Sequence, residues 1–234
     1  MSDLATKRLE AALITRGIST DQRIYGLTLR LCGSVDLGKD LLEFGAGAGF
    51  LAGQIAASGY SGTITCADIQ PRPDDLPANI KWMQADLNNP LPLPDQSFDA
   101  IVTTEVIEHL ENPRFIFREF YRLLRPMGSL VLTTPNQESI RSLAGLLFGG
   151  HFVGFLGRSY PAHITALLHL DFIRICEETG FNAPEFYYTD SGGIPKMPSV
   201  RWQDVSFGLL KGKAFSDNVG VVTTKPRGRM APDS

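Results

Sequence analysis

Three glycines at alternate positions, Gly45, Gly47 and Gly49, are the residues whose spacing points most directly to chemistry. They follow an apolar stretch at 41–44 that predicts a strand, and they precede a helical pattern over 50–58. Glycine leaves no Cβ between the backbone and a ligand, and it tolerates positive φ. A strand, a glycine turn and a helix N-terminus together form a cradle in which a nucleotide can lie against backbone amides.

The spacing of the glycines narrows the choice of nucleotide. Dinucleotide folds typically use G-x-G-x-x-G, whereas this chain has G-x-G-x-G with Glu43 two residues before the first glycine. The departure points away from NAD and towards S-adenosylmethionine. Asp68 and Asp86 each follow a later predicted strand, where one carboxylate can bind the ribose hydroxyls and the other an exocyclic adenine amine. An ordinary turn aspartate is the alternative at both positions.

The elements that must position these residues alternate along the chain. The predicted strands span 40–45, 62–67, 80–84, 98–104 and 128–134, and the predicted helices span 49–58, 112–125 and 165–179. Two closing strands at 181–189 and 219–224 complete the set. This alternation predicts an α/β fold, a Rossmann-like doubly wound sheet of seven mostly parallel strands with an antiparallel last strand. The ligand crevice of such a sheet lies at the carboxyl ends of its strands.

Two further stretches carry a family pattern: FDAIVTTEVIEHL at 98–110 and LLRPMGSLVLTTPN at 123–136. From about 38 to 136 the chain closely resembles class I S-adenosylmethionine-dependent methyltransferases, of the broad type 11 group that includes the ubiquinone-biosynthesis O-methyltransferases. The resemblance continues more weakly through His163 and 177–181. Five motifs in the right order make it specific, whereas the glycine motif alone would be weak.

The resemblance implies a binding site for the methionine end and the ribose of S-adenosylmethionine. The loop residues that match the family pattern, and that would pass under this part of the cofactor, are Gly45, Ala46, Gly47 and Gly49. Glu43 matches the family's acid ahead of the glycines. That acid orders the loop or meets the cofactor's ammonium group through water.

The same resemblance implies contacts to the adenosine. Asp68 matches the acid that binds the ribose, and Ile69 matches the residue that packs on adenine. Asp86 and Leu87 match the pair at the adenine edge. Met127 is a departure, because the family usually has glycine there, and we expect it to alter only its own tight turn.

A group of acids and histidines follows the fourth predicted strand. The resemblance places Thr104 and Glu105 beside the methionine end of the cofactor. Glu105, Glu108 and His109 share one helical face at i, i+3 and i+4, and the distant His163 could close over the same cleft. Because a hydroxyl nucleophile benefits from a general base or a metal ion, we expect catalysis from His109, His163 and Glu105.

The same residues are possible metal ligands. Glu-x-x-Glu-His with a distant histidine resembles the metal ligands of small-RNA 2′-O-methyltransferases and of ubiquinone-type O-methyltransferases. Glu105, Glu108, His109 and His163 could therefore hold a divalent cation. The alternative is that Glu-His-Leu only starts a helix, as it does in many members of the superfamily that need no metal.

Composition and charge restrict the partners. The net charge of −3 and the sequence pI of about 5.8 lack the basic excess of nucleic-acid binders, so a nucleic acid is not the expected partner. A basic stripe on the helix at 112–125 is read as a solvated face. Three widely spaced cysteines argue against disulfides and zinc, and the N-terminus lacks an apolar signal region, which together predict a reducing, cytoplasmic compartment.

The least ordinary segment is 142–157, which is apolar, rich in glycine and too short to span a bilayer. Its glycines and its position favour a lid over an acceptor pocket, with contact to a membrane surface or plain packing as alternatives. We expect one domain over 1–224, with helices in 1–37, this lid-like insertion at 137–163, and a disordered tail at 225–234.

The predicted activity is S-adenosylmethionine-dependent methyl transfer to a small or lipid-like acceptor, chiefly at oxygen, by a cytoplasmic or membrane-peripheral enzyme. One alternative is a 2′-O-methyltransferase acting on RNA, which the acidic pI disfavours. A second is a non-catalytic partner subunit that binds the cofactor. An NAD-dependent dehydrogenase is a distant third.

Overall fold

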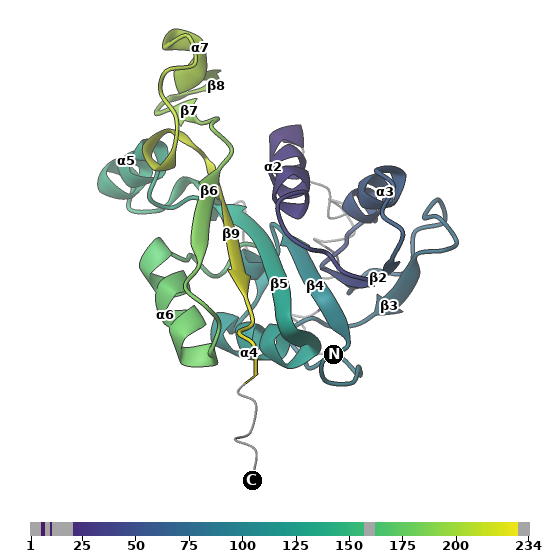
Figure 1. The fold of residues 1–234 in the computed structure, drawn as a ribbon. Helices are drawn as coiled ribbons and strands as arrows, with labels where there is room; N and C mark the ends of the chain where they lie inside the picture. Colours follow the sequence, from purple (N-terminus) through teal and green to yellow (C-terminus); the bar gives the residue numbers. More distant parts are fainter. Residues whose placement is uncertain (1–5, 8–9, 11–20, 157–161, 229–234) are drawn as a thin grey trace.

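The computed structural model describes residues 6–7, 10, 21–156 and 162–228 of the 234-residue chain. Within this part, a seven-stranded sheet forms the centre of the molecule and helices pack on both of its faces (Figure 1). The strands of this sheet are β1 (Asp40–Phe44), β2 (Thr63–Asp68), β3 (Lys81–Gln84), β4 (Phe98–Thr104), β5 (Leu124–Pro135), β6 (Glu185–Tyr188) and β9 (Asn218–Thr224).

The strand order across the sheet is β3-β2-β1-β4-β5-β9-β6. β1 pairs in parallel with β2 and β4, and β4 pairs in parallel with β5, whereas β9 runs antiparallel to β5 and to β6. The predicted Rossmann-like sheet with an antiparallel last strand is therefore confirmed. Because the parallel strands end at one edge, the segments that follow β1, β2 and β4 meet there.

Helices and short turns connect the strands. The α-helices are α2 (Gln22–Cys32), α3 (Phe50–Ala57), α4 (Pro113–Leu123), α5 (Ile140–Gly149), α6 (His169–Thr179) and α7 (Trp202–Val205), and the 3-10 turns are η1 (Ile107–His109), η2 (Val153–Phe155) and η4 (Lys213–Phe215). A separate two-stranded hairpin consists of β7 (Gly193–Ile194) and β8 (Met197–Arg201). The Asp21 side chain caps α2 by accepting a hydrogen bond from the Arg23 N–H.

Two apolar layers hold the sheet between its helices. Successive strand residues point to opposite faces, so Leu41 packs with α2 and α3 while Leu42 and Phe44 pack with α4 and α6. The Phe44 ring meets Phe120 of α4 edge to face, with 4.9 Å between the ring centroids. Full burial of such a side chain stabilises the fold by roughly 1.5–3 kcal/mol. The layers thus fix β1 rigidly beneath the glycine turn.

Some predicted boundaries were wrong. The helix predicted over 112–125 ends at Leu123, and β5 begins at the next residue rather than at 128. Pro126 explains this, because it cannot continue a helix and it keeps the residue before it extended. The helix predicted from 165 begins at His169, since the Thr165 N–H and hydroxyl bond instead to the carbonyls of Glu108 and Leu110.

The structure adds elements that the sequence did not indicate. The apolar, glycine-rich segment after β5 begins with a regular helix, α5, which the Ser139 side chain caps by accepting from the Ser142 N–H. The hairpin β7–β8 and α7 were also not predicted. Lys225, the first residue of the predicted tail, is buried and donates to the carbonyls of Tyr121 and Leu124.

Parts of three predicted segments fall outside the described residues: 1–5, 8–9 and 11–20 of the N-terminal helices, 157–161 of the lid, and 229–234 of the tail. In the part of the chain that is described, none of the helices is both long and apolar enough to cross a membrane.

Candidate functional site

The glycine turn after β1 has the conformation that its sequence demands. Gly45, Gly47 and Gly49 have φ angles of 81°, 54° and 73°, all in the left-handed region. A Cβ at Gly45 would lie 2.3 Å from a methyl carbon of Val106, and one at Gly49 would lie 2.4 Å from a methyl carbon of Leu76. Gly49 is also the N-cap of α3. Positive φ and the lack of space for a Cβ therefore both require glycine at positions 45 and 49.

Glu43 lies buried under this turn and supports it from below. Its Oε2 accepts a hydrogen bond of 2.9 Å from the Ala52 N–H in the first turn of α3, and a longer one of 3.6 Å from the Cys66 thiol. Burial raises the pKa of the Glu43 carboxyl to about 8. This acid could order the loop or meet the cofactor's ammonium group through water. The hydrogen bond to the Ala52 N–H is of the first kind, because it joins Glu43 to the start of α3.

Asp68 ties the end of β2 to the glycine turn. Its two carboxylate oxygens accept from the N–H groups of Gly47 at 2.7 Å and Gln70 at 2.8 Å. The N–H groups of Gly45 and Ala46 donate in turn to the Ala67 carbonyl. Burial raises the pKa of Asp68. The predicted ribose acid and the predicted loop are therefore joined by direct hydrogen bonds.

The end of β3 completes the cofactor side. The Ala85 N–H donates to the Asp68 carbonyl at 2.8 Å, which sets the β3–Asp86 turn beside β2. Leu87 is buried in the core, and Ile69 is half-buried. Asp86 is exposed, and its carboxylate caps its own turn by accepting from the backbone and side chain of Asn88. Its contact with adenine stays a prediction.

Glu105 stands directly after β4 in a strained conformation. Its φ of 53° is rare for a residue with a side chain, and the backbone is held there by a hydrogen bond from its N–H to the Thr133 carbonyl. The Asn218 amide donates to Oε2 at 2.9 Å, whereas the buried Oε1 lacks a partner among the described residues. Burial, and then the charge of Glu108, hold the pKa of Glu105 well above its ordinary value.

Glu108 in η1 is also buried and also has one oxygen with a hydrogen-bond partner and one without. Only 1% of the residue is exposed. The Thr134 hydroxyl donates to Oε2 at 3.0 Å, and the buried Oε1 has no partner in the described part of the chain. Burial raises the pKa of this carboxyl to about 7. Each of the two carboxyl groups is thus oriented through one oxygen and leaves the other available.

His109 presents a free lone pair to Glu108. Its Nδ1 lies 2.8 Å from the Ala162 carbonyl oxygen, which can only accept, so Nδ1 carries the proton and donates. Nε2 is then unprotonated and lies 3.9 Å from Glu108 Oε1. Burial lowers the pKa of His109, which favours this neutral form.

His163 lies beside His109, although it is 54 positions further along the chain. Its ring lies 4.7 Å from that of His109, nearly perpendicular to it. The N–H groups of Ile164 and Thr165 donate to the Glu108 carbonyl and hold the segment against η1. Burial lowers the pKa of His163, and its buried Nδ1 has no partner among the described residues.

Three of these side chains lie close enough together to hold a cation. One ligand atom from each of Glu108, His109 and His163 lies within 4.8 Å of the other two. Carboxylate oxygen and neutral imidazole nitrogen are both ligands of divalent metals. The buried Glu108 oxygen and the His163 nitrogen, both without partners, fit such an ion. Glu105 lies outside this group of three, and metal binding by any of the four residues stays a prediction.

The sequence reasoning missed the residues that orient this group. Asn218 and Thr134 fix the two carboxyl groups, and the Ala162 carbonyl fixes the tautomer of His109. Asn218 begins β9, 113 positions from Glu105, and no spacing rule joins them. Thr134 stands in the TTPN stretch at 133–136, which was noted as a family motif without a role.

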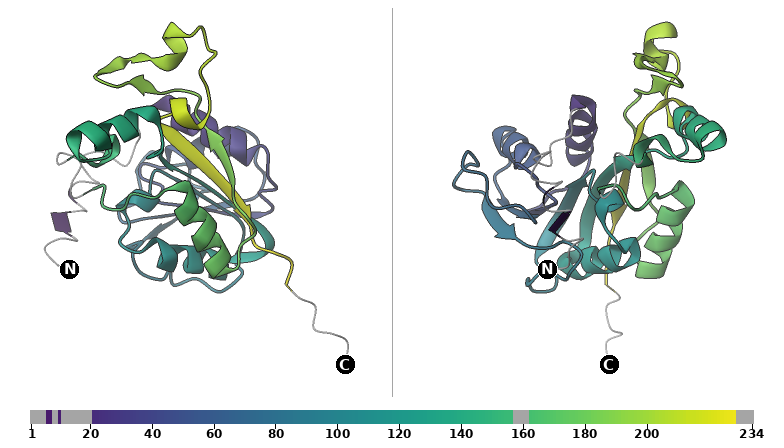
Figure 2. Two further views of the ribbon diagram at one scale, coloured as in Figure 1. Left: turned by 90° about the vertical axis from the view of Figure 1, so that its left-hand side faces the viewer. Right: turned by 180° about the vertical axis from the view of Figure 1, so that it is seen from behind.

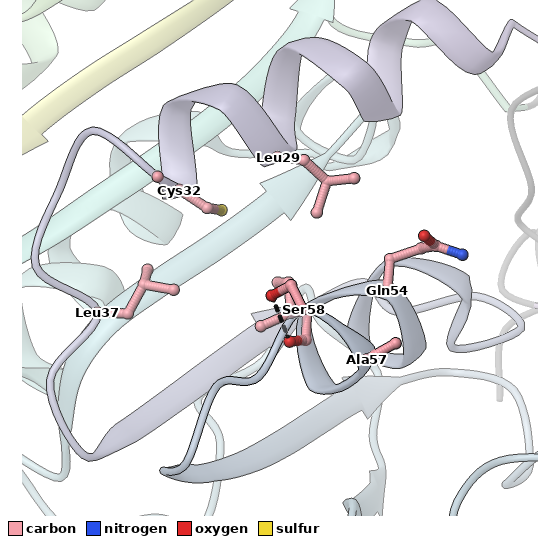
Figure 3. Close-up of a pocket in the computed structure, with 8 residues that line it drawn as sticks. Leu29, Cys32, Leu37, Gln54, Ala57 and Ser58 are labelled. Carbon is pink, nitrogen blue, oxygen red and sulfur yellow. Dashed lines mark hydrogen bonds between the residues drawn. The ribbon is translucent and has the colours of Figure 1, made fainter.

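A separate pocket lies away from this chemistry. It has a volume of about 450 Å³ and is lined by the last turn of α2 with Cys32, the loop after it with Leu37, and the end of α3 with Ser58 (Figure 3). These segments lie near the amino end of β1, opposite the glycine turn. Burial raises the pKa of the Cys32 thiol to about 12, so it is not a nucleophile at neutral pH. The candidate site is therefore the polar group at the carboxyl ends of the strands.

Comparisons with known proteins agree with this geometry. Residues 42–132 match the family model described as "Methyltransferase domain". The chain is 22% identical over 200 residues to a ubiquinone biosynthesis O-methyltransferase of Rickettsia typhi, which covers 80% of this chain and 78% of that protein. It is 39% identical over 106 residues to a probable S-adenosylmethionine-dependent methyltransferase of Mycobacterium tuberculosis, which covers 42% of this chain and 36% of that protein.

A solved structure supports the fold. The S-adenosylmethionine-dependent methyltransferase from Archaeoglobus fulgidus superposes with a TM-score of 0.60 at 17% identity, covering 86% of this chain and 93% of that chain. The sheet order and the glycine turn after β1 thus define the Rossmann-like class I methyltransferase fold. The family match over 42–132 and the relatives together support a class I S-adenosylmethionine-dependent methyltransferase.

Proposed function

We propose that this enzyme transfers the methyl group of S-adenosylmethionine to an oxygen atom of a small acceptor that has an apolar part. The observation that carries the proposal is the position of Val106. Its side chain lies against Gly45, so the acid and histidine segment around it borders the glycine turn directly. The buried carboxyl and imidazole groups then stand beside the cofactor end from which the methyl group leaves.

The cofactor assignments follow from the same geometry. The glycine turn over 45–49 would lie under the methionine and ribose portion, with Asp68 on the ribose hydroxyls. Thr104 and Glu105, at the end of β4, would border the methionine end. Glu43 would meet the cofactor's ammonium group only through the loop or through water, since its carboxyl lies under the turn.

Methyl transfer makes limited demands on the protein. The acceptor oxygen forms a bond to the methyl carbon while the carbon–sulfur bond breaks, and its pair of electrons returns to sulfur, which leaves as a neutral thioether. The protein must align the three atoms and exclude water. In the absence of a bound cation, the hydroxyl proton of the acceptor would pass to a free imidazole nitrogen of the neutral His109 or His163.

We further propose that Glu108, His109 and His163 hold a divalent cation. A bound cation would lower the pKa of the acceptor hydroxyl and help to orient it. Support comes from the two buried atoms that lack partners, Glu108 Oε1 and His163 Nδ1, and from the fixed tautomer of His109. Thr134 and Asn218 would act as positioning residues, because each holds one carboxyl group by a single oxygen.

The segment after β5 supports an acceptor with an apolar part. The Phe155 ring in η2 packs at 5.5 Å on the His163 ring, so an aromatic wall borders the histidines. We therefore propose that the described part of the segment, around Phe155, borders the acceptor side, as expected for a lid.

The charge distribution disfavours RNA as the acceptor. Three arginines of the basic stripe on α4 and at its end are neutralised by carboxylates. The pairs are Arg114–Glu178, Arg122–Glu119 and Arg125–Asp99, with nitrogen–oxygen distances of 2.7, 2.7 and 2.9 Å. A phosphate backbone would have to compete with each of these acids.

The test is to incubate the enzyme with methyl-labelled S-adenosylmethionine and an extract of its source cell, and then to identify the labelled product. We expect label in an O-methyl ether that extracts into organic solvent, reduced by a chelator and restored by a divalent cation. Label in RNA, or transfer only to nitrogen, would contradict the acceptor class. Cofactor binding without any transfer would identify a non-catalytic subunit instead.

A further inference from the structure

A projection joins β6 to β9 and stands beyond the carboxyl ends of the parallel strands, near α5 (Figure 2). It comprises residues 189–217, with β7, β8, α7 and η4. Its base is held firmly to the start of α5. Arg141 pairs with Asp217 at 2.6 Å, and the Asn136 amide donates to the carbonyls of Lys213 and Ser216. The projection is therefore anchored to the rest of the domain by specific contacts.

The tip of the projection presents two large apolar side chains to solvent. Phe207 is 96% exposed and Leu209 is 83% exposed. The turn that carries them is ordered by hydrogen bonds from the Gly208 N–H to the Gln203 carbonyl and from the Leu209 N–H to the Ser206 carbonyl. Phe207 has a φ of 51°, which is unfavourable for an aromatic residue. A fixed and strained turn that holds phenylalanine in water indicates a binding role.

The end of α5 offers the same kind of surface. Leu147 is 76% exposed and Phe148 is 80% exposed, and Ser142 is the only buried residue of this helix. In both views of Figure 2, α5 and the projection lie at the same end of the molecule. We call Leu147, Phe148, Phe207 and Leu209 the apolar tips.

The charges around the apolar tips favour an anionic partner. The projection over 189–217 contains four basic and three acidic residues, whereas the whole chain carries a net charge of −3. Lys196 precedes the Phe207 turn in the sequence and Lys211 follows it, and both side chains are exposed. The sequence from 139 to 170, which includes α5, has no acidic residue. Apolar side chains among lysines, with few acids, are the composition of a surface that binds anionic lipid.

We propose that the apolar tips insert into the interfacial layer of a membrane that contains anionic lipid, with Lys196 and Lys211 at the headgroups. Separate apolar side chains on a helix end and a turn suit a deformable lipid layer better than a rigid protein surface, which requires a contiguous complementary patch. The surface lies at the end of the sheet where the acids and histidines stand. A lipid-like acceptor could thus reach the site from the membrane.

The test measures binding of the full chain, without cofactor, to phosphatidylcholine vesicles with and without phosphatidylserine. We expect binding to the anionic vesicles that weakens with salt and falls at least about tenfold in a Phe207→Ser, Leu209→Ser variant. A Lys196→Glu, Lys211→Glu variant should lose the preference for phosphatidylserine. Ile173→Ser, which removes an exposed apolar side chain from α6, is the matched control and should bind like the wild type.

Three results would overturn the proposal. They are no binding to anionic vesicles, equal loss in the Ile173→Ser control, and a concentration-dependent dimer that the Phe207→Ser, Leu209→Ser variant abolishes. The last result would make the tips an interface between two copies of the chain. Retained S-adenosylmethionine affinity in each variant shows that the fold is intact. Because vesicle binding needs no methyl transfer, failure here is distinguishable from failure of the proposed function.

Discussion

The two sides of the site are built in different ways. The cofactor side consists of a glycine turn and an acid that lie within 26 residues of one another, from Glu43 to Asp68, and it is closed by hydrogen bonds to the backbone. The acceptor side draws its groups from β4, η1, the segment before α6, and β9. It buries two carboxyl groups that each keep one oxygen without a partner in the described chain.

The cofactor side is a preformed binding site, whereas the acceptor side keeps polar groups available for chemistry. On the cofactor side the buried polar groups are satisfied, so the turn is rigid before the ligand arrives. On the acceptor side, unsatisfied buried oxygens are unfavourable for folding and persist only because Thr134, Asn218 and the Ala162 carbonyl hold the groups in place. We therefore expect changes on the two sides to affect different measurable quantities.

The largest effect is expected from Gly47→Val. The backbone φ of 54° is unfavourable for valine, and the added side chain would enter the space proposed for the cofactor. Affinity for S-adenosylmethionine, measured by calorimetry, should fall by about a hundredfold or more. Gly53→Ala in α3, where an added Cβ meets no atom within 4 Å, is the control and should bind normally. Asp68→Ala should resemble Gly47→Val, and unchanged affinity in both variants would refute the cofactor site.

The second effect concerns the cation. Glu108→Gln should weaken binding of Mn²⁺ by about a hundredfold, because the carboxylate ligand becomes a neutral amide. Thr134→Val should weaken it by about tenfold, because the carboxyl loses the hydroxyl that orients it. Paramagnetic resonance of free Mn²⁺ gives both affinities without any turnover. Glu177→Gln, at an exposed position of α6, is the control, and an equal effect there would argue against a specific site.

The third effect is a pH dependence of the free energy of unfolding that comes from Glu43 on the cofactor side. The pKa of Glu43 is about 8 in the folded protein, against 4.5 for an ordinary glutamate. Between these values the folded state keeps a proton that the unfolded state has released, so stability falls as the pH rises, by up to roughly 1.4 kcal/mol per pH unit. Because Glu105, Glu108 and Asp68 also have raised pKa values, Glu43→Gln should reduce the slope in denaturant unfolding without cofactor but not abolish it. An unchanged slope would mean that Glu43 is ionised under the loop.

The smallest effect is expected on the free energy of unfolding, from a change at Met127, which lies in neither side of the site. Met127 lies near the start of β5 with a φ of 70°, at a position where the family usually has glycine, and its N–H donates to the Lys225 carbonyl. Met127→Gly should raise the free energy of unfolding by about 0.5–1 kcal/mol and leave cofactor affinity unchanged. Met127→Ala keeps the Cβ and should bring no such gain. A change in cofactor affinity would show that this position is coupled to the site.

The contrast between the sides also explains what could be predicted from sequence. The glycine turn and Asp68 follow from local rules, since a strand, a turn and a helix start define the geometry within a few residues. The doubly wound, mostly parallel sheet follows from the alternation of strands and helices. By contrast, the contact between Asn218 and Glu105 depends on β9 lying beside β5, which only the packed sheet determines.

Two further features needed the structure for the same reason. The tautomer of His109 depends on the Ala162 carbonyl, which the segment before α6 brings to η1. The exposure of Phe207 could not be predicted, because an apolar residue after a short helix normally indicates packing.

The most direct test of the account measures S-adenosylmethionine binding by calorimetry, without acceptor or cation, for the wild type and for a His109→Ala, His163→Ala variant. The two sides are separate in this account, so both proteins should bind with dissociation constants that agree within about threefold. The wild type should show no preference for NADH. Loss of cofactor affinity in the variant as large as that in Gly47→Val, or selective binding of NADH by the wild type, would contradict it.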